Sequence, residues 1–145
     1  MLKGIDPVLT PELLMRLCAM GHGEWVAIVD ANFTADALAN GRPVIRLPGL
    51  SLLRVCQAVL SVFPLDDAVP QPAAYMHHGG KPVAYRTAVQ KAFVALLGEQ
   101  GANADKVEAV ERFAFYERVR GASVIVQTGE PTAYGNAMLA KGVIL

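Results

Sequence analysis

The residues best suited to chemistry begin in the stretch 20–32, which reads MGHGEWVAIVDAN. His22 lies between two glycines, so no neighbouring side chain covers its imidazole and the backbone there can adopt angles closed to other residues. Trp25–Val29 is a continuous apolar run of β-favouring residues, which predicts a strand buried on both faces. Asp30 follows where that strand ends, and ligands tend to bind at the carboxyl ends of strands in α/β sheets. We therefore expect His22 and Asp30 to lie near each other, and an ordinary helix–glycine–strand connection with a solvated histidine is the alternative.

Other polar residues also fall where predicted strands or helices begin and end. Together with the first two they form one set: His22, Asp30, Arg112, Tyr116, Tyr134 and Asn136. A histidine, a carboxylate, two phenols, an amide and a guanidinium bind hydroxyl groups and move protons. The chain shows no Ser/His/Asp set, no P-loop and no GxGxxG motif. His77 and His78 would point to opposite faces of a strand and have no third ligand nearby, so we expect a solvated loop and no metal site there.

Composition narrows the class of protein. The chain has 145 residues, which predicts one domain over 1–145. Thirteen basic residues balance thirteen acidic ones, which argues against a nucleic-acid or anionic-membrane surface. The apolar fraction of 53% is at or slightly above the usual range, so we expect a large subunit interface. Cys18 and Cys56 have no metal-ligand or redox spacing, and we expect two buried, reduced thiols.

No signal peptide is visible in the N-terminal sequence MLKGIDPVLTPELL. The longest apolar region, Leu52–Leu65, is too short to span a bilayer. These features predict a cytoplasmic protein.

Capping residues mark the predicted helices. Thr10 caps a helix that starts at Pro11, and Gly21 is the expected left-handed stop. Ser51 begins a helix that ends before Pro64. Two more helices are expected over 81–98 and 112–120; the alternation in the second would also suit a strand.

Short apolar runs mark the remaining strands. Besides the run at 25–29, we expect strands at 44–47, 73–76, 107–110, 122–127 and 137–145. The polar segment 31–42 is expected to form a loop that acts as a lid or a subunit contact. Strands that alternate with helices at these intervals predict an α/β fold with one mostly parallel or mixed sheet layered by helices.

Long motifs in a fixed order carry a family resemblance over nearly the whole chain. They are MLKGIDPVLTPELL, MGHGEWVAIVDANF, RLPGLSLLRVCQAVLSVFPLD, ERFAFYERV and TGEPTAYGNAMLAKGV. With these motifs the chain resembles the FucU/RbsD family of sugar mutarotases and pyranases, and FAFYER and YGN resemble the L-fucose mutarotase branch.

The resemblance implies roles for particular residues. It implies that His22 is a general acid/base and Tyr116 the second one, while Asp30, Arg112 and the YGN element contact the sugar. That element is Tyr134, Gly135 and Asn136. The resemblance also places Asp66 at the sugar site, on a weaker sequence match. It further implies ring-shaped homo-oligomers, typically decamers, with each site completed by a neighbouring subunit. Neither a cofactor nor a metal is needed, because ring opening and closure require only proton transfers.

The function expected from this resemblance is interconversion of the α and β anomers of L-fucose or a similar monosaccharide. A D-ribose pyranase, a non-catalytic monosaccharide-binding protein and a structural oligomer are the alternatives. Three features depart from the family pattern, namely Trp25, Thr34 and the loop 77–80. Because loops set specificity, they leave the sugar itself open.

Overall fold

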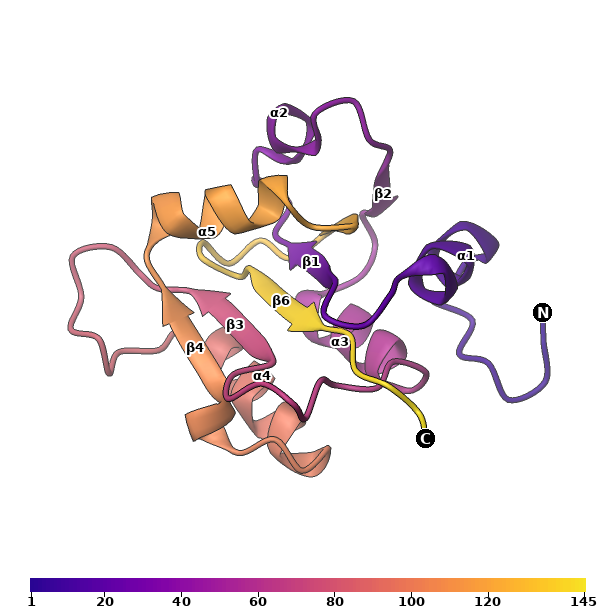
Figure 1. Ribbon diagram of the computed structural model, residues 1–145. Coiled ribbons are helices and arrows are strands. Elements are labelled where there is room, and N and C mark those ends of the chain that lie inside the picture. The colour runs from indigo at the N-terminus through magenta and orange to yellow at the C-terminus, as the bar shows by residue number, and fades with distance from the viewer.

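The computed structural model describes residues 1–145 and is built around a six-stranded mixed sheet with strand order β2-β5-β1-β6-β3-β4 (Figure 1). The elements in chain order are α1 (Pro11–Ala19), β1 (Trp25–Val29), α2 (Ala35–Ala39), β2 (Val44–Leu47), α3 (Leu52–Leu60), β3 (Ala73–Met76), α4 (Ala88–Glu99), a 3₁₀ turn η1 (Ala104–Lys106), β4 (Val107–Val110), α5 (Arg112–Arg120), β5 (Val124–Thr128) and β6 (Ala137–Ala140). The predicted α/β fold with a mixed sheet is confirmed.

The direction of β6 decides which residues meet at one end of the sheet. β1, β2 and β5 are parallel neighbours, β3 and β4 are parallel, and β6 runs antiparallel between β1 and β3. The start of β6 therefore lies where the other strands finish. We call this the carboxyl end of the sheet, and the opposite one the amino end. Ala137 is in register with both Ile28 and Tyr75, so the residue before it lies among the last residues of β1 and β3.

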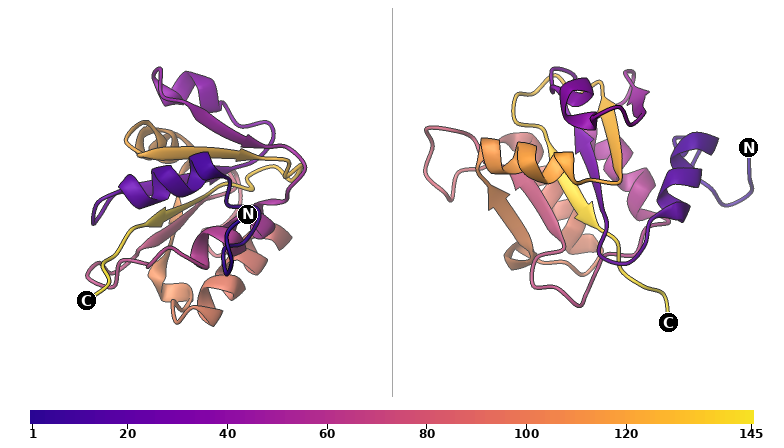
Figure 2. Two further views of the ribbon diagram at one scale, coloured as in Figure 1. Left: turned by 90° about the vertical axis from the view of Figure 1, so that its right-hand side faces the viewer. Right: turned by 45° about the horizontal axis from the view of Figure 1, so that its top comes forward.

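Helices cover both faces of the sheet, which makes three layers (Figure 2). α1, α3 and α4 pack on one face against Val26 and Ile28, whereas α2 and α5 pack on the other against Ala27 and Val29. All four of these strand residues are fully buried. A strand that is apolar on both sides has a continuous apolar sequence, which is why 25–29 shows no alternation.

The helix starts follow the capping residues. Thr10 accepts a hydrogen bond from the Leu13 amide at 3.2 Å and Ser51 one from the Arg54 amide at 3.3 Å, as predicted. α4 instead begins at Ala88, because Thr87 and Gln90 form a reciprocal capping box. The expected start at Lys81 is therefore wrong.

Three further expectations are corrected. Gly21 is not the left-handed stop, because α1 ends at the extended Met20 and the positive φ (79°) belongs to Gly23. α3 ends at Leu60 rather than next to Pro64, which agrees with the extended bias of a residue that precedes proline. The segment expected to be a loop contains the short helix α2.

Only one of the two cysteines is buried. Cys56 is fully buried in α3, and this burial raises the pKa of its thiol. Cys18 is exposed at the end of α1, because the apolar side of this short helix is formed by Leu13 and Leu17. No helix of the protein combines the length and the apolar character needed to cross a bilayer.

Candidate active site

A small hollow opens at the carboxyl end of the sheet and collects most of the polar residues predicted for the site. Its volume is about 240 Å³, and its lining residues are Asp30, Asn32, Phe33, Met76, Arg112, Tyr116, Ala133, Tyr134 and Asn136. Clefts for drug-sized ligands have roughly 300–1,000 Å³, so this hollow suits a smaller ligand such as a monosaccharide. Five of the eight predicted site residues line it.

Asp30 and Asn136 form the buried floor of the hollow. Each is exposed by 6% or less, because β1 delivers Asp30 and the antiparallel β6 starts just after Asn136. Burial raises the pKa of Asp30, and the negative charge of nearby Glu130 raises it further. The hydrogen bonds from the Asn136 amide and the Asn32 backbone N–H act in the opposite direction and lower this pKa. A carboxylate with remaining acceptor capacity at the base of a hollow is suited to hold a sugar hydroxyl.

Arg112 and Tyr116 stand one helical turn apart at the start of α5. The Arg112 Nε–H donates to the Tyr116 phenol oxygen at 2.9 Å, and the Tyr116 ring packs edge-on against Phe33. Glu111 caps the helix by accepting from the Phe113 and Ala114 amides, which fixes where α5 begins. The contact with Tyr116 raises the pKa of Arg112. In turn, the guanidinium stabilises negative charge on the phenol oxygen when a proton leaves it.

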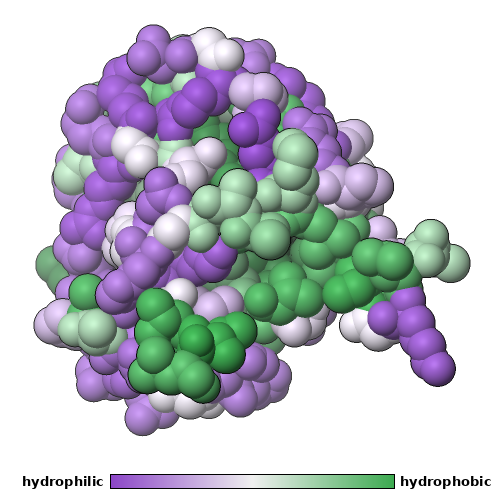
Figure 3. Space-filling view, turned by 45° about the vertical axis from the view of Figure 1, so that its right-hand side comes forward, coloured by the Kyte–Doolittle hydropathy of each residue, from purple (hydrophilic) through white to green (hydrophobic).

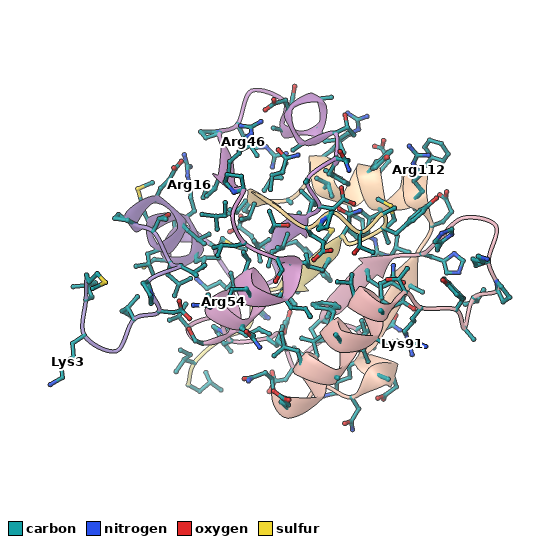
Figure 4. The ribbon with its side chains drawn as sticks, turned by 180° about the vertical axis from the view of Figure 1, so that it is seen from behind. Lys3, Arg16, Arg46, Arg54, Lys91 and Arg112 are labelled. Atoms are coloured by element: carbon teal, nitrogen blue, oxygen red, sulfur yellow. The ribbon has the colours of Figure 1, made fainter.

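Figure 4 shows on which side of the molecule Arg112 lies. Arg112 lies on the side that carries the loop between β3 and α4, whereas Arg16 on α1 lies on the opposite side.

Tyr134 and Gly135 make the tight turn that leads into β6. Tyr134 has φ +63°, a left-handed conformation that is uncommon outside glycine. The buried Gln90 side chain donates to the Tyr134 carbonyl at 3.0 Å and to the Met76 carbonyl at 2.7 Å. A Cβ on Gly135 would lie 2.8 Å from Glu130 Cγ and 2.9 Å from the Thr132 carbonyl oxygen. Glycine is therefore required sterically at this position.

His22 and Asp66 pair at the amino end of the sheet. His22 Nε2 lies 3.1 Å from Asp66 Oδ1; the His22 side chain is 51% exposed and that of Asp66 only 3%. Burial alone would raise the pKa of Asp66, but the hydrogen bonds from His22 and the Ala68 amide outweigh it, so the pKa is lowered. A buried carboxylate on one ring nitrogen fixes the tautomer and orientation of the imidazole. The other nitrogen is left for chemistry.

The loop that carries His22 is fastened to the end of β6. The Lys141 ammonium donates to the Leu17 and Met20 carbonyls at 2.8 and 2.6 Å, and the Gly23 amide donates to the Lys141 carbonyl at 2.8 Å. The histidine thus has a fixed backbone and a fixed ring.

The structure divides the predicted residues between the two ends of the sheet. Asp30, Arg112, Tyr116, Tyr134, Gly135 and Asn136 lie at the carboxyl end, and His22 and Asp66 lie at the amino end. The strand β1 separates the groups, and at about 3.3 Å per residue its five residues span roughly 13 Å between their Cα atoms. The expectation that His22 and Asp30 lie near each other is therefore wrong within one chain, because a residue before a strand and one after it sit at opposite ends.

Sequence reasoning missed two features of the site. Gln90 braces the Tyr134 turn, and the signal for it is the Thr87-x-x-Gln90 capping-box spacing. Glu130 is 5% exposed, lies close to Asp30 and accepts from the Thr132 amide; nothing in the local sequence sets it apart from a loop carboxylate.

A second, larger hollow lies at the amino end of the sheet. It has about 740 Å³ beside Asp66, and Val62, Phe63, Pro64 and Ile144 are among its lining residues. We assign the ligand site to the smaller hollow, since it combines the buried Asp30 and Asn136 with Arg112 and Tyr116. No three His, Cys, Asp or Glu residues gather so as to hold a metal ion.

Fold and site thus define a mixed α/β protein that has a small hollow lined by polar side chains and a histidine–aspartate pair. The family model described as "RbsD / FucU transport protein family" matches residues 3–144, and the chain belongs to this family. It is 41% identical over 145 residues to the L-fucose mutarotase of Glaesserella parasuis, covering 99% of this chain and 96% of that one. It is also 41% identical over 146 residues to the fucose mutarotase of Mus musculus, covering 99% and 95% of the two chains.

Solved structures agree with this assignment. The Streptococcus pneumoniae fucose mutarotase in complex with L-fucose matches with a TM-score of 0.89 and 29% identity, over 99% of this chain and 100% of that chain. FucU from Bifidobacterium longum matches with a TM-score of 0.92 and 37% identity, over 99% of this chain and 100% of that chain. RbsD of Bacillus subtilis, solved with D-ribose, has a TM-score of 0.73 at 20% identity over 100% of both chains and shares the fold.

Proposed function

We propose that this protein is a mutarotase that interconverts the α and β anomers of L-fucose or a closely related monosaccharide. The observation that carries the proposal is the convergence of Asp30, Asn136, Arg112 and Tyr116 on one hollow of monosaccharide size. Full-length identity of about 40% to fucose mutarotases supports the sugar. The reaction class is an isomerisation of a carbohydrate.

The residue types fit the proton transfers that mutarotation requires. The anomeric hydroxyl loses its proton, its electron pair forms the C1 carbonyl, and the ring C1–O bond breaks as the ring oxygen gains a proton. Rotation about the C1–C2 bond and the reverse steps give the other anomer. We assign the two proton transfers to Tyr116 and His22, and hydroxyl binding to Asp30, Asn136 and Arg112. Positioned acid–base groups typically contribute about 10²–10⁴-fold.

We further propose that each site is completed by a second copy of the chain. Within one chain His22 cannot reach a sugar in the hollow, because β1 lies between them. A neighbouring copy that presents its own His22–Asp66 pair to the hollow would bring both proton-transfer groups to one sugar. A closed ring of such contacts, for which ten subunits is the number expected, makes the amino end of one copy meet the carboxyl end of the next.

The face around α1 and the two chain ends is suited to such a contact. Apolar side chains gather there (Figure 3). Its exposed apolar residues are Met1, Leu2, Met15, Val62, Ile144 and Leu145. Exposed apolar surface of this kind typically marks an interaction site, and this face lies beside the hollow next to Asp66.

The test is saturation-transfer proton NMR on equilibrated L-fucose. Irradiation of the α-anomeric proton should reduce the β signal in the presence of wild-type protein. With His22→Ala, the β signal should fall no more than it does in buffer alone. Full activity of a folded His22→Ala protein would overturn the mechanism. Transfer with D-ribose between pyranose and furanose forms, and none with L-fucose, would instead assign a pyranase. Saturable sugar binding without exchange would assign a binding protein.

A further inference from the structure

The loop between β3 and α4, residues 77–87, carries aromatic residues that the proposed reaction does not use. His78 stacks on Tyr134 with ring centroids 4.2 Å apart and an interplanar angle of 27°. Tyr85 meets His78 edge-on at 5.7 Å, and the Lys81 ammonium lies 5.4 Å from the Tyr85 ring centroid. The stack thus runs from the loop surface to a residue that lines the hollow.

The loop is held in place at several points, so its stack has a fixed position. The His77 amide donates to the Val110 carbonyl at 2.7 Å, and the His77 ring lies 3.0 Å from the Pro82 carbonyl oxygen. At the far end, Arg86 Nε–H donates to the Tyr75 hydroxyl at 3.1 Å. His78 itself has Nδ1 at 2.9 Å from the Gly79 carbonyl oxygen, a contact that holds the plane of its ring.

Tyr134 is constrained on its backbone and on its ring by different partners. Gln90, 1% exposed, fixes the carbonyl in the left-handed turn. That bond leaves the ring free to rotate about the side-chain torsions. His78 covers one ring face, and a Cβ on Gly79 would lie 3.5 Å from the Tyr134 hydroxyl oxygen. The ring is therefore held against the loop, and Tyr134 is one of the residues that line the hollow.

We propose that His78 is a positioning residue that holds the Tyr134 ring as an apolar wall of the sugar site and so sets the preference for a sugar that carries a methyl group. This inference rests on the proposed function. An aromatic stack is worth about 0.5–1.5 kcal/mol beyond its buried area, which converts to roughly 2- to 12-fold. A methyl group buried against an apolar wall changes affinity by about fourfold.

A comparison of two sugars separates the contribution of the Tyr134 wall from that of the hydroxyl-binding residues. D-Arabinopyranose is L-fucopyranose with a hydrogen in place of the methyl group, so the hydroxyl groups that Asp30 and Asn136 would hold are the same. The ratio of kcat/KM for L-fucose and D-arabinose therefore reports on contact with the methyl group alone.

The experiment measures anomer exchange of both sugars, with KM and kcat separated, in the wild type and three variants. His78→Ala removes the stack, His78→Phe keeps an aromatic ring there, and Val83→Ala is the control in the same loop because Val83 is 77% exposed. With His78→Ala we expect the KM for L-fucose to rise about three- to tenfold while kcat changes by less than about twofold. The preference for L-fucose should fall from about fourfold to about one. His78→Phe should restore it, and Val83→Ala should match the wild type.

A preference ratio unchanged in His78→Ala, or the same ratio in His78→Phe as in His78→Ala, would overturn the inference. Absence of exchange in the wild type would overturn the proposed function and not this inference. In that case the dissociation constants of both sugars, measured by ligand-observed NMR on the same four proteins, decide it. A preference for L-fucose over D-arabinose in binding that falls in His78→Ala and returns in His78→Phe would support the positioning role of His78. The same preference in all four proteins would refute it.

Discussion

Asp30 and Asn136 exchange two hydrogen bonds across the start of β6. The Asp30 amide donates to Asn136 Oδ1, and Asn136 Nδ2 donates to Asp30 Oδ2, each at 2.9 Å. An amide side chain can accept from a backbone N–H through its oxygen and, at the same time, donate to a carboxylate through its nitrogen. The pair therefore joins the end of one strand to the beginning of its antiparallel neighbour.

Asn136→Asp should lower the free energy of unfolding at neutral pH by about 1–3 kcal/mol, because it replaces the buried donor with a second acceptor. Two adjacent carboxylates raise each other's pKa, so the deficit should shrink as the pH falls and one of them takes up a proton. Urea unfolding at several pH values measures this. Asn103→Asp is the control, since it adds the same charge at an exposed position outside the hollow; an equal loss in both variants would contradict the prediction.

The pKa of Asp66 should rise in His22→Ala. Burial acts to raise this pKa, and the hydrogen bond from His22 is the largest of the contacts that lower it below its ordinary value of 3.8. With His22 present, Asp66 stabilises the fold above pH 3.8, and this contribution is lost as the pH falls through its lowered pKa. Without His22, burial of Asp66 dominates and its pKa is raised. The free energy of unfolding of the His22→Ala protein should therefore decrease as the pH rises through this raised pKa.

Carbon-detected NMR titration of the carboxyl groups measures this shift, and the exposed Asp67 next in the chain provides an internal reference. If the pKa of Asp66 is the same in the His22→Ala protein as in the wild type, the His22–Asp66 pair does not persist in solution.

Tyr116→Phe should abolish most anomer exchange while it leaves the fold intact. The phenol oxygen is lost, and a general acid–base group contributes about 10²–10⁴-fold. Sugar binding and thermal unfolding should stay close to wild type, because the Tyr116 ring and its packing on Phe33 are retained. Exchange at the wild-type rate would remove Tyr116 from the mechanism.

Mixing two inactive variants should restore activity if a site is shared between copies. In a shared site, one chain supplies Tyr116 and its neighbour supplies His22. The His22→Ala chain still supplies Tyr116, and the Tyr116→Phe chain still supplies His22. After unfolding and joint refolding at equal amounts, about a quarter of the interfaces join two intact halves. Exchange should therefore return to roughly a quarter of the wild-type level. The two variants refolded separately and then combined are the control, and no recovery on joint refolding would argue against shared sites.

Gly135→Ala should destabilise the protein by about 1–3 kcal/mol, since the new methyl group would overlap Glu130 and the Thr132 carbonyl. Gly98→Ala provides the opposite case. Gly98 lies inside α4, and no atom lies within 4 Å of the position that a Cβ would take there, so alanine should stabilise the protein by about 1 kcal/mol. Thermal unfolding of both proteins measures the contrast, and equal effects would contradict the steric argument.

Much of the fold could be predicted because its signals are local. The strand over 25–29 and the caps at Thr10 and Ser51 depend on neighbouring residues, and all are where the sequence indicates. The start of α4 is harder to predict because Pro82 also suits the first turn of a helix, and only the Thr87–Gln90 capping box marks the true boundary.

The candidate site is harder still, because it depends on strand direction. Nothing local reveals that β6 runs antiparallel, and that direction alone brings Asn136 beside Asp30. Likewise, the short distance in sequence between His22 and Asp30 suggests proximity, whereas an extended strand moves such residues apart. The partnership of His22 with Asp66 spans 44 residues and has no local signal.

The five-residue length of β1 has a consequence for how activity depends on concentration. If each end of that strand supplies half of a site, an isolated chain carries two incomplete halves and catalyses nothing. Activity per chain then follows the law of mass action for assembly, so dilution below the dissociation constant of the contact turns the enzyme off without unfolding it. With sites shared in this way, the strand would act as a spacer that makes self-association a condition of turnover.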